Sequence, residues 1–141
     1  MPRTIKWKLC LQSAPSKVFT YLTSKEGIER FWAEKAAIKD GYIQLSFPNN
    51  QRYASKILNQ EPNRNFRIEY FNSIVDFNIS ENEFGGTRLE VVNSNVEKEE
   101  YLANYAGWVS VLITLKAAID FGVDLRNHDP QKTWNDGYVD N

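Results

Sequence analysis

The stretch that decides the fold is Glu99–Phe121, EEYLANYAGWVSVLITLKAAIDF, near the C-terminal end of a chain of 141 residues. Its apolar residues recur every three or four positions, which predicts one long helix. The recurring residues are Leu102, Tyr105, Trp108, Val109, Leu112, Leu115 and Ile119. Val111 and Ile113 widen this apolar stripe, so we expect a broad face of the helix to be buried. Glutamates at its start and Gly122 after its last turn are typical of helix ends.

Short runs of alternating apolar and polar residues precede this helix and predict β-strands. They cover residues 5–11, 36–39, 42–47, 53–58, 66–70, 75–79 and 89–92. Asp40-Gly41 and Gly85-Gly86 predict tight hairpins, and the short connections favour antiparallel neighbours. Each run places its apolar residues on one face, and only the long helix is long enough to cover that face. The sequence therefore predicts an α+β domain, in which a curved antiparallel sheet of about seven strands wraps around the C-terminal helix.

Two short helices are predicted between the first and second strands. Ser13 offers an N-cap and Pro15 suits a first helical turn, so the first helix runs to about Thr23. Ser24 can cap the second helix, which leads to Phe31-Trp32. Helices this short are marginal alone, so we expect both to be held by packing against the sheet.

Composition indicates a single domain over residues 1–141 with no attraction to polyanions. The formal net charge is −1, which disfavours nucleic acid and anionic lipid surfaces as partners. No run approaches the roughly 18 apolar residues that cross a bilayer, and the start of the chain shows no apolar signal segment. The single cysteine, Cys10, fits a reducing compartment. We expect a soluble, cytoplasmic protein with no membrane partner.

Residues 123–141 form a tail without helical or strand periodicity. The tail carries two large aromatic residues, Trp134 and Tyr138, which free tails usually lack. We therefore expect it to dock on the domain or on a neighbouring subunit. The sequence does not decide whether the protein forms a homodimer.

Five residue pairs occur in an ordered set along the chain: Ala14-Pro15, Phe31-Trp32, Gly86-Thr87, Gly107-Trp108 and Leu115-Lys116. Together they resemble the START-like (SRPBCC) superfamily, and within it the bacterial branch related to the C-terminal domain of the activator of Hsp90 ATPase. The resemblance extends from about Trp7 to Asp120. It implies a helix-grip, Bet v 1-like fold, with an apolar cavity between the sheet and the C-terminal helix. The eukaryotic activator also has a separate N-terminal domain, for which this chain has no room.

The resemblance implies varied functions, from small-molecule carriage to cyclase-type enzymes and chaperone stimulation in the stress response, so fold alone does not choose among them. Our leading interpretation is a domain that binds a small, mainly apolar molecule in its cavity, with one or two tyrosine hydroxyls orienting it. The residues expected to line this cavity are Trp32, Phe47, Tyr53, Tyr70, Phe77, Leu89, Tyr105, Trp108 and Leu112. The alternative is that these side chains fill the space completely.

Two other functions stay open: a co-chaperone-like modulator of an Hsp90-type ATPase, and a cyclase or hydrolase that uses cavity tyrosines. The sequence favours a role without catalysis, and we assign no catalytic residue, metal ligand or cofactor. His128 is the only histidine, and its polar surroundings favour a surface or capping role over that of a general base. His128, Asp129, Asp136 and Asp140 lack the spacing of a metal site, and Cys10 reads as an ordinary strand cysteine.

Overall fold

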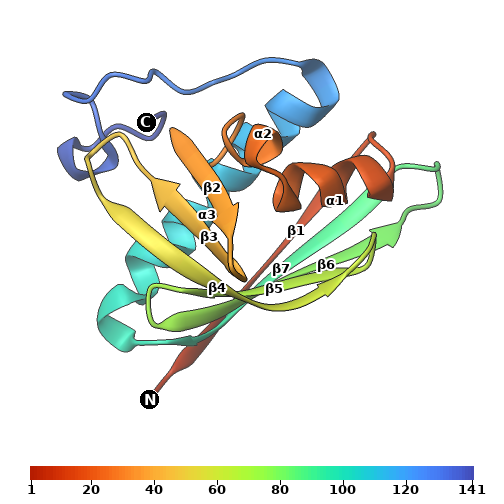
Figure 1. The fold of residues 1–141 in the computed structure, drawn as a ribbon, viewed down its shortest axis with the longest axis horizontal. Helices are drawn as coiled ribbons and strands as arrows, with labels where there is room; N and C mark the ends of the chain where they lie inside the picture. Colours follow the sequence, from red (N-terminus) through yellow and green to blue (C-terminus); the bar gives the residue numbers. More distant parts are fainter.

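The computed structural model describes all 141 residues. Its main feature is a seven-stranded antiparallel sheet that curves around a long helix (Figure 1). The strands stand in the order β1-β7-β6-β5-β4-β3-β2. Along the chain the elements are β1 (Arg3–Leu11), α1 (Pro15–Thr23), α2 (Lys25–Ile28), β2 (Lys35–Lys39), β3 (Tyr42–Ser46), β4 (Arg52–Glu61), β5 (Asn65–Tyr70), β6 (Ser73–Glu81), β7 (Thr87–Val96), α3 (Lys98–Phe121) and a short 3-10 helix, η1 (Trp134–Asp136). The predicted fold class is confirmed.

Alternation along the strands gives the sheet one apolar and one polar face, as the sequence predicts. The apolar side chains that face α1 and α3 are at most 1% exposed: Ile43, Leu45, Phe66, Ile68, Val75, Phe77, Leu89 and Val91. The hairpin between β2 and β3 has a positive φ at both central residues, 54° at Asp40 and 81° at Gly41. This geometry matches the right-handed twist of the paired strands.

The two short helices pack against the end of the sheet beside α3. Ser24 caps α2 as predicted, because its side chain accepts a hydrogen bond from the Gly27 amide at 3.0 Å. The predicted cap at Ser13 is wrong: Ala14 is the N-cap of α1 and makes no side-chain bond there. The Ser13 hydroxyl instead donates to Asp120 Oδ1 at 2.8 Å, which ties the end of β1 to the end of α3. Sequence position alone cannot reveal this competing partner.

Helix α3 buries a narrower face than its apolar sequence suggests. Its contact with the sheet is made by Trp108, Leu112, Leu115 and Ile119, each less than 5% exposed. The outward face also carries apolar side chains, and we call this set the outer stripe: Leu102, Val109 and Ile113, which are 43–77% exposed. The expectation that the whole apolar set is buried is therefore wrong. When a helix carries apolar residues on all sides, the spacing of those residues in the sequence does not show which side is buried.

The outer stripe also changes one expectation about membranes. The sequence analysis predicts no apolar stretch long enough to cross a membrane. By length and composition, however, α3 is long and apolar enough to cross a bilayer. Core helices of water-soluble domains meet the same test. Here α3 lies against the concave face of a compact α+β domain (Figure 1), which is the position of a core helix.

Candidate ligand cavity

A cavity of about 710 Å³ lies between the first half of α3 and the sheet. Its other walls come from the turns that join β3 to β4 and β5 to β6, and from the segment after α2. Three residues of the C-terminal tail complete the lining: Trp134, Asn135 and Asn141. Sites for small molecules typically have volumes of about 300–1,000 Å³, so this space is large enough for one.

Aromatic side chains make up much of the wall. Seven line the cavity: Phe31, Trp32, Phe47, Tyr70, Phe71, Trp108 and Trp134. Three of them form a cluster, with ring centroids 5.3 Å apart for Trp32 and Tyr70, 5.8 Å for Tyr70 and Trp108, and 5.9 Å for Trp32 and Trp108. Tilted pairs at these distances are favourable beyond their burial alone, so the wall holds its shape.

A buried polar network fixes the orientation of the Trp108 ring. Trp108 Nε1 donates to Asn93 Oδ1 at 3.0 Å, and Asn93 is fully buried. The Asn93 amide in turn donates to Ser73 Oγ at 2.8 Å and to the Ile74 carbonyl at 3.0 Å. Because every polar group in this chain of bonds has a partner, rotating Trp108 would leave a buried group unsatisfied.

Tyr70 is the one titratable side chain of the inner wall. Burial raises the pKa of its phenol to about 12, so the hydroxyl stays protonated at neutral pH. A neutral phenol in an apolar wall can donate a hydrogen bond to a ligand and orient it. No histidine, cysteine, lysine or arginine lines the cavity.

Gly107 lies in the middle of α3 and faces the cavity. A Cβ atom at this position would meet no other atom within 4 Å, so the space beside it is open. Glycine inside a helix destabilises it by roughly 0.5–1 kcal/mol relative to alanine. Here no turn, close approach or positive φ requires glycine, and its effect is to leave room in the cavity.

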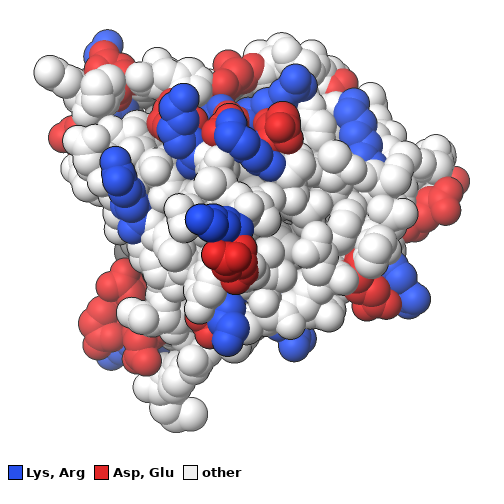
Figure 2. Space-filling view, in the orientation of Figure 1, with Lys and Arg blue, Asp and Glu red and all other residues white.

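The rim of the cavity at the start of α3 is acidic. Glu97, Glu99 and Glu100 all line it, all are exposed, and none forms an ion pair. Figure 2 shows carboxylate side chains gathered at the lower left of the molecule, where Figure 1 places the start of α3. These glutamates are the only charged side chains that line the cavity.

The structure brings together four of the nine predicted cavity residues, namely Trp32, Phe47, Tyr70 and Trp108. Tyr53 lies one layer away, stacked on Phe71 with ring centroids 4.3 Å apart. Phe77, Leu89 and Leu112 are buried in the core rather than in the lining.

Tyr105 is on the wrong side of α3 for a cavity residue. Its ring packs against Trp7 of β1, with the ring centroids 4.8 Å apart, so Tyr105 lies on the flank of α3 that faces β1. The period of three and four that selects Trp108 also selects Tyr105, which is three residues away. Because α3 has apolar residues on more than one side, the periodicity wrongly predicts that Tyr105 lines the cavity.

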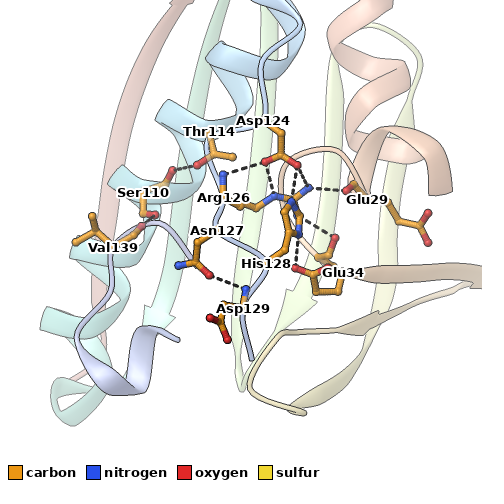
Figure 3. A network of polar contacts seen from close by, with 11 residues as sticks. Glu29, Glu34, Ser110, Thr114, Asp124, Arg126, Asn127, His128, Asp129 and Val139 are labelled. Atoms are coloured by element: carbon orange, nitrogen blue, oxygen red, sulfur yellow. Dashed lines mark hydrogen bonds and ion pairs between the residues drawn. The ribbon is translucent and has the colours of Figure 1, made fainter. Parts of the chain in front are cut away.

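Arg126 anchors the tail to the domain. Its guanidinium, only 4% exposed, donates to the carbonyls of Ala33 at 3.0 Å and Glu29 at 2.6 Å. It also binds both carboxylate oxygens of Asp124, at 3.0 and 3.1 Å (Figure 3). This fork satisfies a buried charge with a carboxylate and two carbonyls, the condition under which arginine tolerates burial. Sequence reasoning misses it, because a single Asp-x-Arg in a polar tail is not distinctive.

His128 lies between two carboxylates beside this anchor. Its ring nitrogens are 2.7 Å from Glu34 Oε1 and 2.7 Å from Asp124 Oδ2 (Figure 3). Partial burial lowers the pKa of His128, but the bonds to Asp124 and Glu34 outweigh it and raise the pKa. Partial burial of Asp124 raises the pKa of its carboxyl, but hydrogen bonds from Arg126 and His128 outweigh this effect and lower the pKa to about 2. We call Asp124, Arg126 and His128 the tail anchor.

Beyond the anchor the tail returns along α3 to the cavity. Ser110 donates to the Val139 carbonyl at 2.6 Å, so this part of the tail lies against the middle of the helix (Figure 3). This path brings Trp134 and Asn135 into the cavity wall. The structure gives no group of three His, Cys, Asp or Glu side chains placed to hold a metal ion.

A curved antiparallel sheet that grips a C-terminal helix, with a cavity between the two, defines the START-like class of α+β domains. Within this class, residues 12–120 match the family described as activator of Hsp90 ATPase homolog 1-like protein, and the chain belongs to that family. A search among curated proteins gives no match.

Several solved structures share the fold. A Staphylococcus saprophyticus protein, SSP2350, is 21% identical, with 88% of this chain and 96% of that one covered and a TM-score of 0.79. The Aha1 dimer of Colwellia psychrerythraea is 20% identical, with coverages of 85% and 98% and a TM-score of 0.76. DynU16, a putative protein in the dynemicin biosynthetic locus, is 14% identical, with coverages of 86% and 48% and a TM-score of 0.73. At these identities the likeness shows the fold.

Proposed function

We propose that this protein binds a small, mainly apolar molecule in the cavity between α3 and the sheet. The observation that carries the proposal is a space of about 710 Å³ whose 23 lining residues include seven aromatic side chains, with a helix-interior glycine facing it. Affinity would come from apolar burial, at about 25 cal/mol per Å² removed from water. The Tyr70 hydroxyl supplies a polar contact inside the wall. The exposed thiol of Cys10 fits the reducing cytoplasm, where we place this activity.

A neutral aromatic probe, N-phenyl-1-naphthylamine, tests the proposal by fluorescence titration and by native mass spectrometry of the complex. Two variants of α3 make a matched pair. Ala103 lines the cavity, so Ala103→Trp should block the probe; Ala106 is exposed and does not line it, so Ala106→Trp should leave binding unchanged. Equal binding by both variants, or none by the unaltered protein, would contradict cavity binding.

The family description supports a second candidate, modulation of an Hsp90-type ATPase. The exposed outer stripe of α3 offers an apolar surface for a protein partner. The measurement is the ATPase rate of the Hsp90 homologue from the same cell, with and without this protein. An unchanged rate at saturating concentration argues against the co-chaperone role and leaves ligand binding untouched.

We also propose that the chain forms a homodimer through the outer stripe. The Colwellia relative is described as a dimer, and a second copy would cover apolar surface that the monomer leaves in water. Ile113, 51% exposed, is the residue to change. Ile113→Glu should shift the mass measured by light scattering towards the monomer, whereas Leu58→Glu, at an exposed apolar position of β4, should not. A monomer in the unaltered protein refutes the assembly.

A further inference from the structure

We infer that the cavity takes a cationic ligand, an amine or quaternary ammonium carried on an apolar, aromatic-sized body. This inference rests on the proposed binding function and adds the charge of the ligand to it. Two independent features of the lining support it, the sign of the rim charges and the chemistry of the wall.

The rim charges all have one sign. Glu97, Glu99 and Glu100 line the cavity, no cationic side chain does, and none of the three has an ion-pair partner. Lys98 and Arg52 are neighbours of lining residues along the chain, but neither lines the cavity. An anionic ligand would therefore be repelled by these carboxylates at the entrance, while a cation would find them unpaired.

The wall favours the same sign. Aromatic faces carry negative electrostatic potential and attract cations within about 6 Å of the ring centroid. Trp134, which is 37% exposed, offers its ring to the cavity from the tail, whereas Trp32 and Trp108 of the aromatic cluster are at most 6% exposed. Tryptophan is the strongest of the aromatic partners of a cation, so a positively charged group beside Trp134 would be stabilised by the wall as well as by the rim.

The glutamates also have a local role, which does not remove their effect on a ligand. Acidic side chains in a first turn are stabilised by the positive end of the helix. That end carries roughly half a unit of positive charge, against three carboxylates. The entrance therefore stays negative.

The test uses three probes with one naphthalene ring: 2-(2-naphthyl)ethylamine as the cation, 2-(2-naphthyl)ethanol as the neutral form and 2-naphthylacetate as the anion. Their affinities are measured by isothermal titration calorimetry at low salt. We expect the amine to bind more tightly than the alcohol, and the acetate more weakly. Raising the ionic strength should narrow the difference between amine and acetate, because the rim charges are exposed to solvent.

A charge-matched pair of double variants locates the effect. Glu99→Gln/Glu100→Gln should weaken amine binding about threefold to tenfold, as expected for removal of two exposed charges, and weaken alcohol binding by a smaller factor. Glu81→Gln/Glu83→Gln removes the same charge at the β6–β7 turn, outside the cavity lining, and should change neither. Thermal melts check that each variant is folded.

The outcomes separate this inference from the proposed function. If the alcohol binds and the amine and acetate bind equally well, or the acetate binds best, the charge inference is wrong and cavity binding stands. An equal loss of amine affinity in both double variants also overturns it. If none of the three probes binds, the proposed function fails and the inference fails with it.

Discussion

Gly107 gives the sharpest prediction, because substitutions at this position should affect helix stability and cavity volume separately. If the glycine exists only to leave room, Gly107→Ala should stabilise the protein. The added methyl group meets nothing within 4 Å, so no strain offsets the gain in helix propensity. That gain is about 0.5–1 kcal/mol, which for a domain of this size raises Tm by about 2–4 °C. Thermal unfolding followed by circular dichroism measures it.

A larger residue at the same position should separate stability from function. Gly107→Leu projects a branched side chain into the open space, so we expect a protein at least as stable as the original that binds N-phenyl-1-naphthylamine at least tenfold more weakly. Such a loss corresponds to about 1.4 kcal/mol, within the range for overpacking a fitted site. Ala106→Leu, one residue away on the exposed side, is the control and should keep full affinity. Destabilisation by Gly107→Ala, or full affinity in Gly107→Leu, would refute the reasoning.

Three further predictions concern the tail anchor and Tyr70. The raised pKa of His128 stabilises the fold fully below its unfolded value of 6.5, and this contribution is lost as pH rises through the folded value. The loss of Tm caused by His128→Gln should therefore be largest below pH 6.5 and shrink at alkaline pH, and a loss independent of pH would contradict the pairing with Asp124 and Glu34. Arg126→Met should lower the free energy of urea unfolding by about 2–3 kcal/mol, because it leaves two carbonyls and Asp124 without their donor; a change below about 0.5 kcal/mol would mean that the tail contributes little. Tyr70→Phe should leave the affinity for an apolar hydrocarbon probe unchanged and weaken a hydrogen-bonding ligand severalfold, with calorimetry as the measurement.

The sheet could be predicted from sequence because each of its strands has one wet and one dry face. Alternation in residues 66–70 and 75–79 assigns Phe66 and Phe77 to the core correctly, and Asp40-Gly41 fixes a hairpin by its chemistry. These are local signals, and the physical cause of each lies within a few residues.

Helix α3 shows where such reasoning ends. Periodicity separates two faces only when one of them is polar, and α3 is apolar on the sheet side and on the outer stripe. Trp108 and Tyr105 therefore look equivalent in sequence, although one lines the cavity and the other packs on Trp7 outside it. The tail anchor is harder still, because Arg126 finds Ala33 and Glu29 across more than ninety residues of chain.

Under the proposed function, the position of the tail would make ligand binding and tail docking parts of one equilibrium. Trp134 and Asn135 belong to the cavity wall only while the tail lies along α3, where Ser110 holds the Val139 carbonyl. A ligand that touches Trp134 must therefore stabilise the docked tail, and a docked tail must raise the affinity for that ligand by the same factor. His128 does not line the cavity, but because its pKa is raised by its partners, the stability of the docked tail should depend on pH. The cavity wall therefore combines a packed aromatic cluster, which includes Trp32 and Trp108, with a segment held by the tail anchor.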